Sequence, residues 1–242
     1  MSKLPHYQLF IDGQWREGSE GQRLESENPA TGQAWASFAC ASKADVDQAV
    51  AAAKRALTDP AWRDMSQTAR GKLLYKLADL CARDAVAIGR IETTDSGKLL
   101  AETSAQSGYV ADYYRYFAGL ADKIEGAVLP IDKPDMQVFT TREPIGVVAA
   151  VVPWNAQMFL TATKLGPALA AGCTVVLKAS EIAPAPMLEF AKLIQEAGFP
   201  PGVVSIITGD AENCAIPLTR HKDVDRIAFT GGPETARHVI RN

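Results

Sequence analysis

The 242-residue chain is long enough to bury a full core, as one large domain or two small ones. Its 47% hydrophobic and 22% charged residues are typical of a soluble globular protein, and a net charge of −3 gives no indication of nucleic-acid or anionic-membrane binding. The longest uncharged stretch, residues 144–163, holds Pro153, Asn155 and Gln157, which favours a buried strand and loop over a membrane span. The N-terminus lacks an apolar signal segment, so we expect a cytoplasmic protein.

The chain begins with strand signals. Tyr7, Leu9 and Ile11 alternate with polar residues up to Asp12-Gly13, a pattern that predicts a hairpin closed by a type I′ turn. A second turn cluster at residues 28–32 precedes an expected short strand at residues 35–38.

Helices are expected next. Ser42 and Asp45 form a capping-box signature before the first helical pattern. Further helices are expected over residues 66–87 and 99–120, with helix-rich sequence continuing from the first of them through Ile91 and a break at residues 95–97. The second of these carries an aromatic cluster, which we interpret as packing, with stacking on a ligand ring as the alternative. Its members are Tyr109, Tyr113, Tyr114, Tyr116 and Phe117.

Residues 126–143 change character, with β-branched residues, two prolines and a strand-like segment at residues 137–141. We expect an extended arm or hairpin here. Its strand edges would be exposed unless something covers them, and a partner subunit is one way to do so.

From residue 145 onward, apolar strand-like runs alternate with helix-compatible segments. The expected strands are residues 145–152, 174–178, 203–207 and 226–229, and the expected helices are residues 158–171, 184–197 and 211–219, with one more opening at Pro233. This alternation predicts an α/β fold with a doubly wound parallel sheet covered by helices on both faces. Ligands of such sheets collect outside the carboxyl ends of the strands.

Polar residues stand at the ends of two of these strands. Asn155 follows the first, and Lys178, Ser180 and Glu181 follow the second. Lys178 and Glu181 are suited to hold ribose hydroxyls, and a solvated ion pair is the alternative. Asn155 is suited to donate to an oxyanion, and a loop-stabilising role is equally open. Lys164 is interpreted as a lysine that reaches water, with a relay role as the alternative.

The turn after the last strand places Gly231 and Gly232 before Pro233 at a helix start. Backbone N–H groups at such a start can approach an anion closely, and the helix dipole contributes roughly 0.3–1 kcal/mol. A dinucleotide phosphate would suit this turn. A tight turn without a ligand stays open, because no GxGxxG motif is present.

Cysteines and histidines give no metal signature. Cys40, Cys81, Cys173 and Cys214 lack CxxC spacing, and the chain has three histidines. We therefore expect neither a zinc site nor a disulfide framework, and interpret each cysteine as a small buried hydrophobic residue.

Several motifs together resemble the NAD(P)-dependent aldehyde dehydrogenase family. They are IDGQW, NPATG, ETTDSGK, YFAGLADKIEG, EPIGVVAAVVPWN, PALAAGCTVVLK, GFPPGVV and FTGG, in this order. The resemblance implies a Rossmann-like fold of the aldehyde dehydrogenase type, with a helix-rich N-terminal region and a β-arm. The implied division is residues 1–125 as the first part of the coenzyme-binding domain, 126–144 as an oligomerisation arm and 145–242 as the Rossmann-like core.

The resemblance also implies roles for individual positions. Asn155 matches the asparagine whose amide stabilises the thiohemiacetal oxyanion, and Lys164 matches a lysine assigned in some members to a charge relay. Lys178 and Glu181 match the residues that hold the adenosine ribose, and Glu181 favours NAD over NADP because it repels a 2′-phosphate. The other implied coenzyme-binding positions are Val152, Trp154, Ser180, Gly209, Phe229, Thr230, Gly231 and Gly232.

The sequence departs from the family pattern at three positions. Gln157 stands where proline is usual, Gly232 replaces a serine, and Ala236 stands where a glycine is common. Ala156 and Gln157 together indicate a roomier and more polar entrance for substrate.

The family's general-base glutamate and nucleophilic cysteine are expected beyond Asn242, and neither Cys173 nor Cys214 matches the nucleophile. We expect the source protein to oxidise an aldehyde to a carboxylic acid with NAD(P)+ through a cysteine thiohemiacetal, and this chain to supply coenzyme binding and Asn155. Expected partners are the aldehyde and further copies in a dimer or tetramer, without nucleic acid or membrane. The alternatives are a catalytically inactive nucleotide-binding or assembly module and an inert structural domain.

Overall fold

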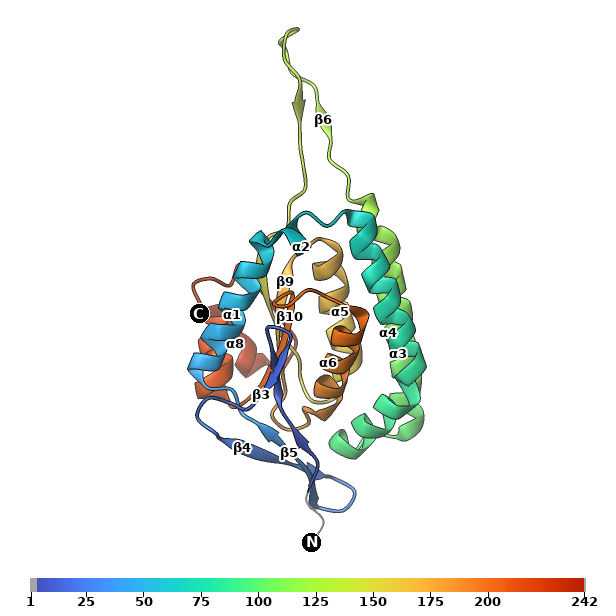
Figure 1. The fold of residues 1–242 in the computed structure, drawn as a ribbon, viewed down its shortest axis with the longest axis vertical. Coiled ribbons are helices and arrows are strands. Elements are labelled where there is room, and N and C mark those ends of the chain that lie inside the picture. The colour runs from blue at the N-terminus through green and yellow to red at the C-terminus, as the bar shows by residue number, and fades with distance from the viewer. Residues whose placement is uncertain (1–3, 242) are drawn as a thin grey trace.

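A computed structural model describes residues 4–241 and has an α/β fold with a long arm projecting from one end (Figure 1). The strands are β1 (His6–Tyr7), β2 (Leu9–Ile11), β3 (Gln14–Arg16), β4 (Arg23–Asn28), β5 (Gln33–Ala39), β6 (Val128–Leu129), β7 (Val138–Phe139), β8 (Val147–Val151), β9 (Thr174–Ala179), β10 (Val204–Thr208) and β11 (Arg226–Phe229). The helices are α1 (Lys43–Thr58), α2 (Pro60–Arg63), α3 (Gln67–Ser96), α4 (Leu100–Leu120), α5 (Gln157–Ala170), α6 (Ala185–Ala197), α7 (Ile216–Thr219) and α8 (Pro233–Arg241). Short turns of 3-10 helix, η1 (Ala121–Lys123), and π-helix, η2 (Ala211–Ala215), complete them.

The central sheet has the strand order β11-β8-β9-β10-β2-β3. Its first four strands are mutually parallel, and β2 and β3 are antiparallel to their neighbours. From β8 the chain passes through β9 and β10 on one side and then returns to place β11 on the other side. This order confirms the doubly wound sheet, with β8 at the point where the winding reverses.

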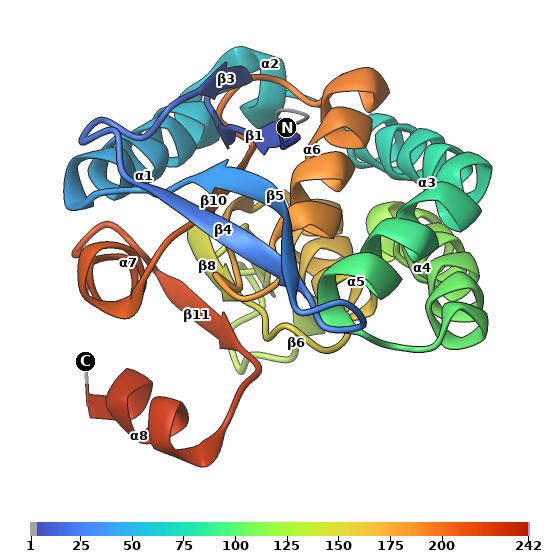
Figure 2. The same ribbon diagram turned by 90° about the horizontal axis from the view of Figure 1, so that it is seen from below.

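Helices cover both faces of the sheet, and Figure 2 shows α1 and α7 on one side and α3 to α6 on the other. Val148 and Ala150 belong to the core formed with α3 to α6, whereas Val147 and Ala149 belong to the core formed with α1 and α7. The strands alternate their side chains between two cores, so each must be apolar throughout. Fully burying one valine or leucine side chain contributes about 1.5–3 kcal/mol.

The expected turns and caps are confirmed at the N-terminal elements. Asp12 and Gly13 have φ of 55° and 73°, as a type I′ turn requires, and this turn joins β2 to β3. The Ser42 side chain accepts from the backbone of Asp45, whose own side chain accepts from the backbone of Ser42, so the capping box is complete. Helix α3 ends at Gly97, whose φ of 75° is left-handed.

The start of β8 and the end of α3 differ from the expected boundaries. Strand β8 begins at Val147, because Gly146 has a φ of 126° that interrupts the strand, and Ile145 is 55% exposed. Helix α3 continues through Ser96, nine residues beyond the expected end at residue 87. The break expected at residues 95–97 is confirmed, so the extra turns belong to the same helix.

Asp95 connects the small sheet β1-β5-β4 to the helical layer. It is 1% exposed and accepts hydrogen bonds from Ser26 Oγ, from Trp35 Nε1 at 3.0 Å and from the backbone N–H of Ala185 at 2.8 Å. Burial raises the pKa of this carboxyl, although the hydrogen bonds oppose the shift. One carboxylate therefore joins β4, β5, α3 and the first turn of α6.

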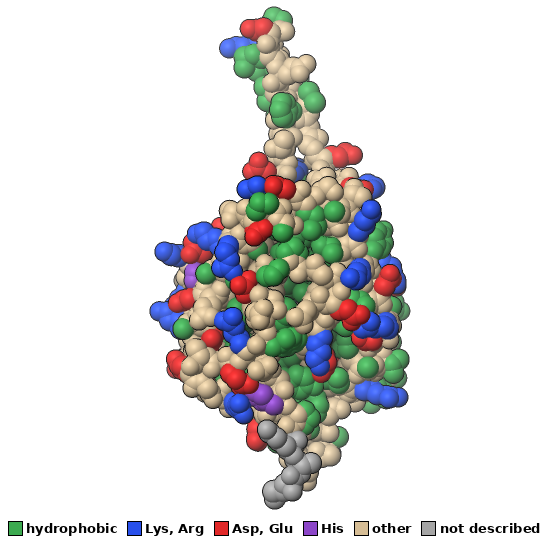
Figure 3. All heavy atoms as spheres, in the orientation of Figure 1, with side chains coloured by type: hydrophobic (Ala, Val, Ile, Leu, Met, Phe, Trp, Pro, Cys, Tyr) green, Lys and Arg blue, Asp and Glu red, His purple; other side chains and the backbone are tan. Residues whose placement is uncertain are grey.

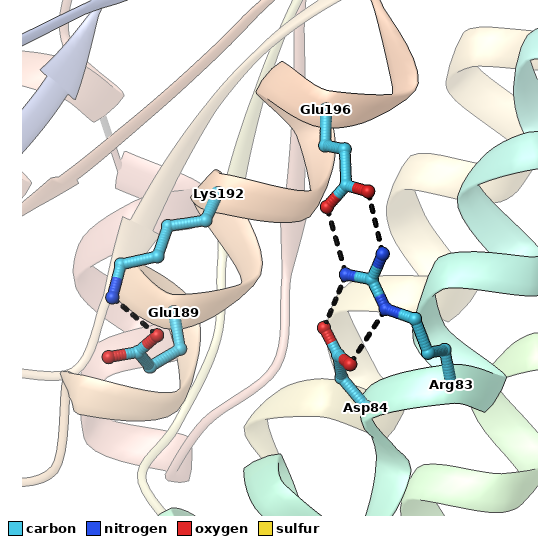
Figure 4. A network of polar contacts seen from close by, with 5 residues as sticks. All are labelled: Arg83, Asp84, Glu189, Lys192 and Glu196. Carbon is cyan, nitrogen blue, oxygen red and sulfur yellow. Dashed lines mark hydrogen bonds and ion pairs between the residues drawn. The ribbon is translucent and has the colours of Figure 1, made fainter.

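A surface network joins α3 to α6 (Figure 4). The Arg83 guanidinium donates to both carboxylate oxygens of Glu196, at 2.6 and 2.8 Å, and also to Asp84. Hydrogen bonds from Arg83 lower the pKa of both carboxyl groups. The three side chains are partly exposed, so this network contributes less to stability than the buried Asp95 contacts.

Residues 126–143 form the expected arm. Its paired strands, β6 and β7, are only two residues long, shorter than the strand expected at residues 137–141. Val128 is 81% exposed and Phe139 is 69% exposed, and Figure 3 shows apolar side chains along the arm. The hairpin therefore projects apolar surface away from the body of the protein.

The aromatic residues of α4 mostly pack against other elements. Tyr114 is fully buried and stacks on Phe190 at 6.0 Å between ring centroids, and Tyr113 meets Phe159 edge-on at 5.0 Å. Tyr109 is 63% exposed. Packing is thus confirmed for the buried members of the cluster.

The buried hydroxyl of Tyr114 makes no hydrogen bond to another described residue. An unpaired buried polar group costs about 1–3 kcal/mol, so we expect Tyr114→Phe to raise the free energy of unfolding by roughly that amount. Urea denaturation measures this change, and Tyr109→Phe is the matched control on the exposed face. A less stable Tyr114→Phe variant would contradict the expectation.

Candidate functional site

The carboxyl ends of the four parallel strands meet at one edge of the sheet. Val151 of β8 lies opposite both Lys178 of β9 and Phe229 of β11. Ala179 lies opposite Thr208, the last residue of β10. The loops that follow these strands therefore start side by side, as the sequence predicts.

Lys178 and Glu181 form an ion pair at this edge. Lys178 Nζ lies 2.5 Å from Glu181 Oε2, and Lys178 is only 5% exposed. Ser180 is also buried, and its hydroxyl accepts from the backbone N–H of Ile182 at 3.3 Å. Because the lysine is buried, the pair differs from the solvated surface ion pair that the sequence left open. The ammonium group of Lys178 and the carboxylate of Glu181 thus both lie at the carboxyl edge of the sheet.

The loop after β8 presents its polar side chain to solvent. Val152 is buried, and its backbone N–H donates to the carbonyl of Lys178 at 3.3 Å. Trp154 is 44% exposed and Asn155 is exposed. The Asn155 amide forms no hydrogen bond within residues 4–241, so both of its N–H donors are available to a ligand.

The expectation that Gln157 makes the substrate entrance more polar is wrong. This first residue of α5 is 0% exposed, and its Nε2 donates to the carbonyl of Ala183. Its Oε1 is buried without a partner among the described residues. The side chain turns inward because the Ala183 carbonyl provides an acceptor there. Gln157 thus braces α5 against the segment before α6.

The two glycines in the turn after β11, Gly231 and Gly232, have different surroundings. The backbone N–H of Thr230 donates to the carbonyl of Val151 at 3.1 Å, which fixes the start of the turn. A Cβ on Gly231 would lie 2.5 Å from the Phe229 ring, whereas a Cβ on Gly232 would meet nothing within 4 Å. Gly232 is exposed directly before α8, where free N–H groups of the first helical turn can receive an anion.

A cavity of about 220 Å³ opens between this turn and the helices that follow β10. Its lining is mostly apolar: Val151, Ala211, Ala215, Ile216, Thr219, Phe229, Thr235, His238 and Val239. Of these residues, Phe229 alone was predicted from the sequence to be a site residue. Apart from Val151 of β8, the others come from η2, α7 and α8, whose approach to one another is set by tertiary packing. The spacing of apolar residues within residues 211–219 was the sequence signal that could have identified this wall of the cavity.

Gly209, at the end of β10, is required by packing. A Cβ there would lie 2.9 Å from Cys214 Cβ and 3.1 Å from the carbonyl oxygen of Ala41. The glycine lets η2 pack against the segment that precedes α1. It therefore positions one wall of the cavity.

Lys164 lies on α5 and reaches the turn after β11. Its Nζ donates to Thr230 Oγ1 at 2.6 Å and to the carbonyl of Leu160 at 3.4 Å. The lysine is half-buried, and burial lowers the pKa of its ammonium group. Lys164 thus connects α5 to the turn instead of extending freely into water.

The cysteines are buried, as expected. Burial raises the pKa of the Cys40 thiol to about 11 and the pKa values of the Cys81 and Cys214 thiols to about 12. No group of three or more potential metal ligands is clustered within residues 4–241. Among the helices of the same residues, none has the length and apolar character to cross a membrane.

The fold and the site define a doubly wound α/β domain whose ligand edge suits a dinucleotide. The model of the aldehyde dehydrogenase family matches residues 15–242. The chain belongs to the aldehyde dehydrogenase family.

Two relatives illustrate the similarity in sequence. The chain is 58% identical over 239 residues to (Z)-2-((N-methylformamido)methylene)-5-hydroxybutyrolactone dehydrogenase of Acinetobacter baylyi, covering 99% of this chain and 49% of that protein. It is 42% identical to a cytosolic aldehyde dehydrogenase of Elephantulus edwardii, covering 98% of this chain and 48% of that protein. The chain thus spans about half the length of these relatives.

Solved structures agree. Betaine aldehyde dehydrogenase of Staphylococcus aureus in complex with NAD+ superposes with a TM-score of 0.95 at 35% identity, covering 98% of this chain and 47% of that one. A variant aldehyde dehydrogenase of Bacillus cereus gives 0.95 at 37% identity, with 98% and 48% covered.

The lowered pKa of Lys164 leads to a pH-dependent stability. Between the folded-state pKa and the ordinary value of 10.5, the unfolded chain binds more protons than the folded one, so the free energy of unfolding should rise with pH in that window. Lys164→Met removes this contribution. Urea denaturation in a pH series ending near 10.5 should show the wild type gaining stability relative to the variant. The exposed Lys192→Met is the control, and parallel curves for wild type and Lys164→Met would contradict the assignment.

Proposed function

We propose that this chain is the coenzyme-binding part of an NAD-dependent aldehyde dehydrogenase, which oxidises an aldehyde to a carboxylic acid. The observation that carries the proposal is the juxtaposition of three features at one sheet edge: the ion pair between buried Lys178 and Glu181, the open turn before α8, and the apolar cavity that η2, α7 and α8 line. Membership of the family and its similarity to a structure solved with NAD+ support it.

The residues present fit a dinucleotide. The apolar cavity lined by Ile216 and Val239 would take the adenine, and Lys178 with Glu181 would hold the adenosine ribose by donating to and accepting from its hydroxyls. The turn at Gly231 and Gly232 would receive the pyrophosphate at the start of α8. The Glu181 carboxylate would repel a 2′-phosphate, so NAD is favoured over NADP.

The reacting end is assigned to the loop after β8. When bound, the nicotinamide supplies the hydride acceptor for aldehyde oxidation. Asn155 is exposed with unused amide donors, so it can stabilise negative charge that develops on the aldehyde oxygen. Trp154 and Val152 would form the wall beside it. Lys164, held on Thr230, would act by keeping the turn before α8 in position.

Coenzyme binding by the chain tests the cavity assignment. Calorimetric titration with NAD should give a saturable signal, and NADP should bind more weakly. Ile216→Arg fills the cavity with a charged side chain, so we expect its affinity for NAD to fall by at least about tenfold. Ile240→Arg, which changes an 84% exposed position on α8, is the matched control. Equal affinities for NAD in the two variants would show that the adenine does not bind in this cavity.

Turnover by the chain alone should be absent. A thiolate is the nucleophile in cysteine chemistry, and the described cysteines are buried, three of them with raised pKa values. Incubation with NAD and a panel of aldehydes should therefore give no NADH above a blank. The panel should include the substrate named for the Acinetobacter baylyi relative. NADH formation well above the blank would overturn this assignment.

A second candidate function is assembly. The apolar side chains on the arm, with Val128 81% exposed, favour a contact with another chain. On this proposal, residues 126–144 act as an oligomerisation arm between the N-terminal part, residues 1–125, and the Rossmann-like core, residues 145–242, and the whole protein is a dimer or tetramer. A nucleotide-binding or assembly module without catalysis would retain the arm and the cavity.

A further inference from the structure

A second cavity lies at the opposite edge of the central sheet. It has a volume of about 510 Å³ and is lined by residues that precede β8 and β9, among them Pro144, Gly146 and Gly172, together with the segment from α2 to the first turns of α3. In Figure 1, the arm leaves the body at this end, close to α2. The cavity is separated from the proposed coenzyme site by the length of the strands.

Arg70 forms part of the wall of this cavity and is held there by two contacts. The residue is only 9% exposed, and its Nη1 donates to the carbonyl of Met65 at 3.1 Å. Its guanidinium carbon lies 5.9 Å from the centroid of the Trp62 ring, and Trp62 Nε1 donates to the carbonyl of Gly172 at 2.9 Å. A Cβ on Gly172 would come within 3.2 Å of the guanidinium, so the glycine leaves room for the flat group.

The guanidinium lacks a counter-ion among the described residues. Arg70 Nε is buried and makes no hydrogen bond within residues 4–241, and Arg70 takes part in none of their ion pairs. Arg63, which lines the same cavity, is different: its Nε and Nη2 donate to Asp64 at 2.7 and 2.9 Å. A buried charge without a partner is costly, so an unpaired arginine in a cavity indicates a place for an anion.

The start of α3 adds to the positive potential at Arg70. Arg70 belongs to the first turns of this 30-residue helix, whose N-cap is Ser66. The backbone N–H groups of the first turn lack intrahelical acceptors, and the helix dipole favours negative charge at this end. Ser66 and Gln67 also line the cavity, whose acidic lining residue, Glu143, is exposed and not paired with Arg70.

We propose that the cavity at Arg70 is a binding site for an oxyanion, a carboxylate or phosphate group, received by the guanidinium and the start of α3. The planar fork of arginine matches two oxygens of such a group, and Trp62 and Gly172 hold the fork in one orientation. The proposal stands apart from coenzyme binding because the site lies at the amino ends of the strands and shares no residue with the carboxyl edge.

Nuclear magnetic resonance of the chain tests the site directly. The Arg70 Nε–H signal is followed while sodium acetate or inorganic phosphate replaces chloride at constant ionic strength. A saturable shift of this signal supports the site, and the tighter-binding anion identifies a carboxylate or a phosphate as the preferred group. If the Arg70 Nε–H signal keeps the position that it has in chloride when acetate or phosphate is added, the proposal is overturned. This measurement needs no substitution and so does not depend on a variant that folds.

Variants provide the second arm. Arg70→Gln should weaken binding of the preferred anion by at least about tenfold, because it removes the charge and the fork. Arg63→Gln is the matched control on the same wall, and we expect it to bind within about twofold of wild type, because Asp64 already neutralises Arg63. Equal losses in both variants would indicate general electrostatic attraction and would overturn the assignment to Arg70.

Discussion

The burial of β8 on both faces constrains the rest of the structure. Val147 and Ala149 face one core and Val148 and Ala150 the other, so helices must cover both sides. The chain leaves β8 in one direction through β9 and β10 and returns on its other side as β11, so the loops after β8 and β11 diverge. The apolar cavity and the turn before α8 lie at this carboxyl edge of the sheet, and Asn155 belongs to the loop that leaves β8 there. The position of the proposed site thus follows from strand order.

Much of this fold was predictable because parallel strands buried on both faces are continuous apolar runs. The errors arose where backbone conformation or tertiary contact decides. The positive φ of Gly146 interrupts the apolar run, so β8 begins at Val147, two residues later than predicted. The last turns of α3 contain Glu92 and Asp95, polar residues that pattern reasoning places on a surface but that the fold buries.

The sequence predicted those site residues whose place in the fold depends only on their position at the end of a strand. Asn155, Lys178 and Glu181 lie at strand ends, and strand order alone brings them to one edge. The cavity walls on α7 and α8 were not predictable, because two helix faces must first pack. Gln157 turns inward toward a carbonyl 26 positions away, a contact that has no local signal. Arg70 is similar, since only the folded structure shows that no carboxylate within residues 4–241 pairs with it and that its Nε makes no hydrogen bond there.

The Asp95 junction has a consequence for the order of assembly. Its partners, Ser26 and the backbone of Ala185, lie 69 and 90 positions away along the chain, so the junction closes only after α3 and the start of α6 have come together. Contacts between distant segments form late, because the intervening chain must first be ordered. During synthesis from the N-terminus, β4 and β5 emerge from the ribosome well before α6. β4 and β5 are therefore made early but joined to α6 late, and until then their apolar residues lack the cover that the completed fold provides.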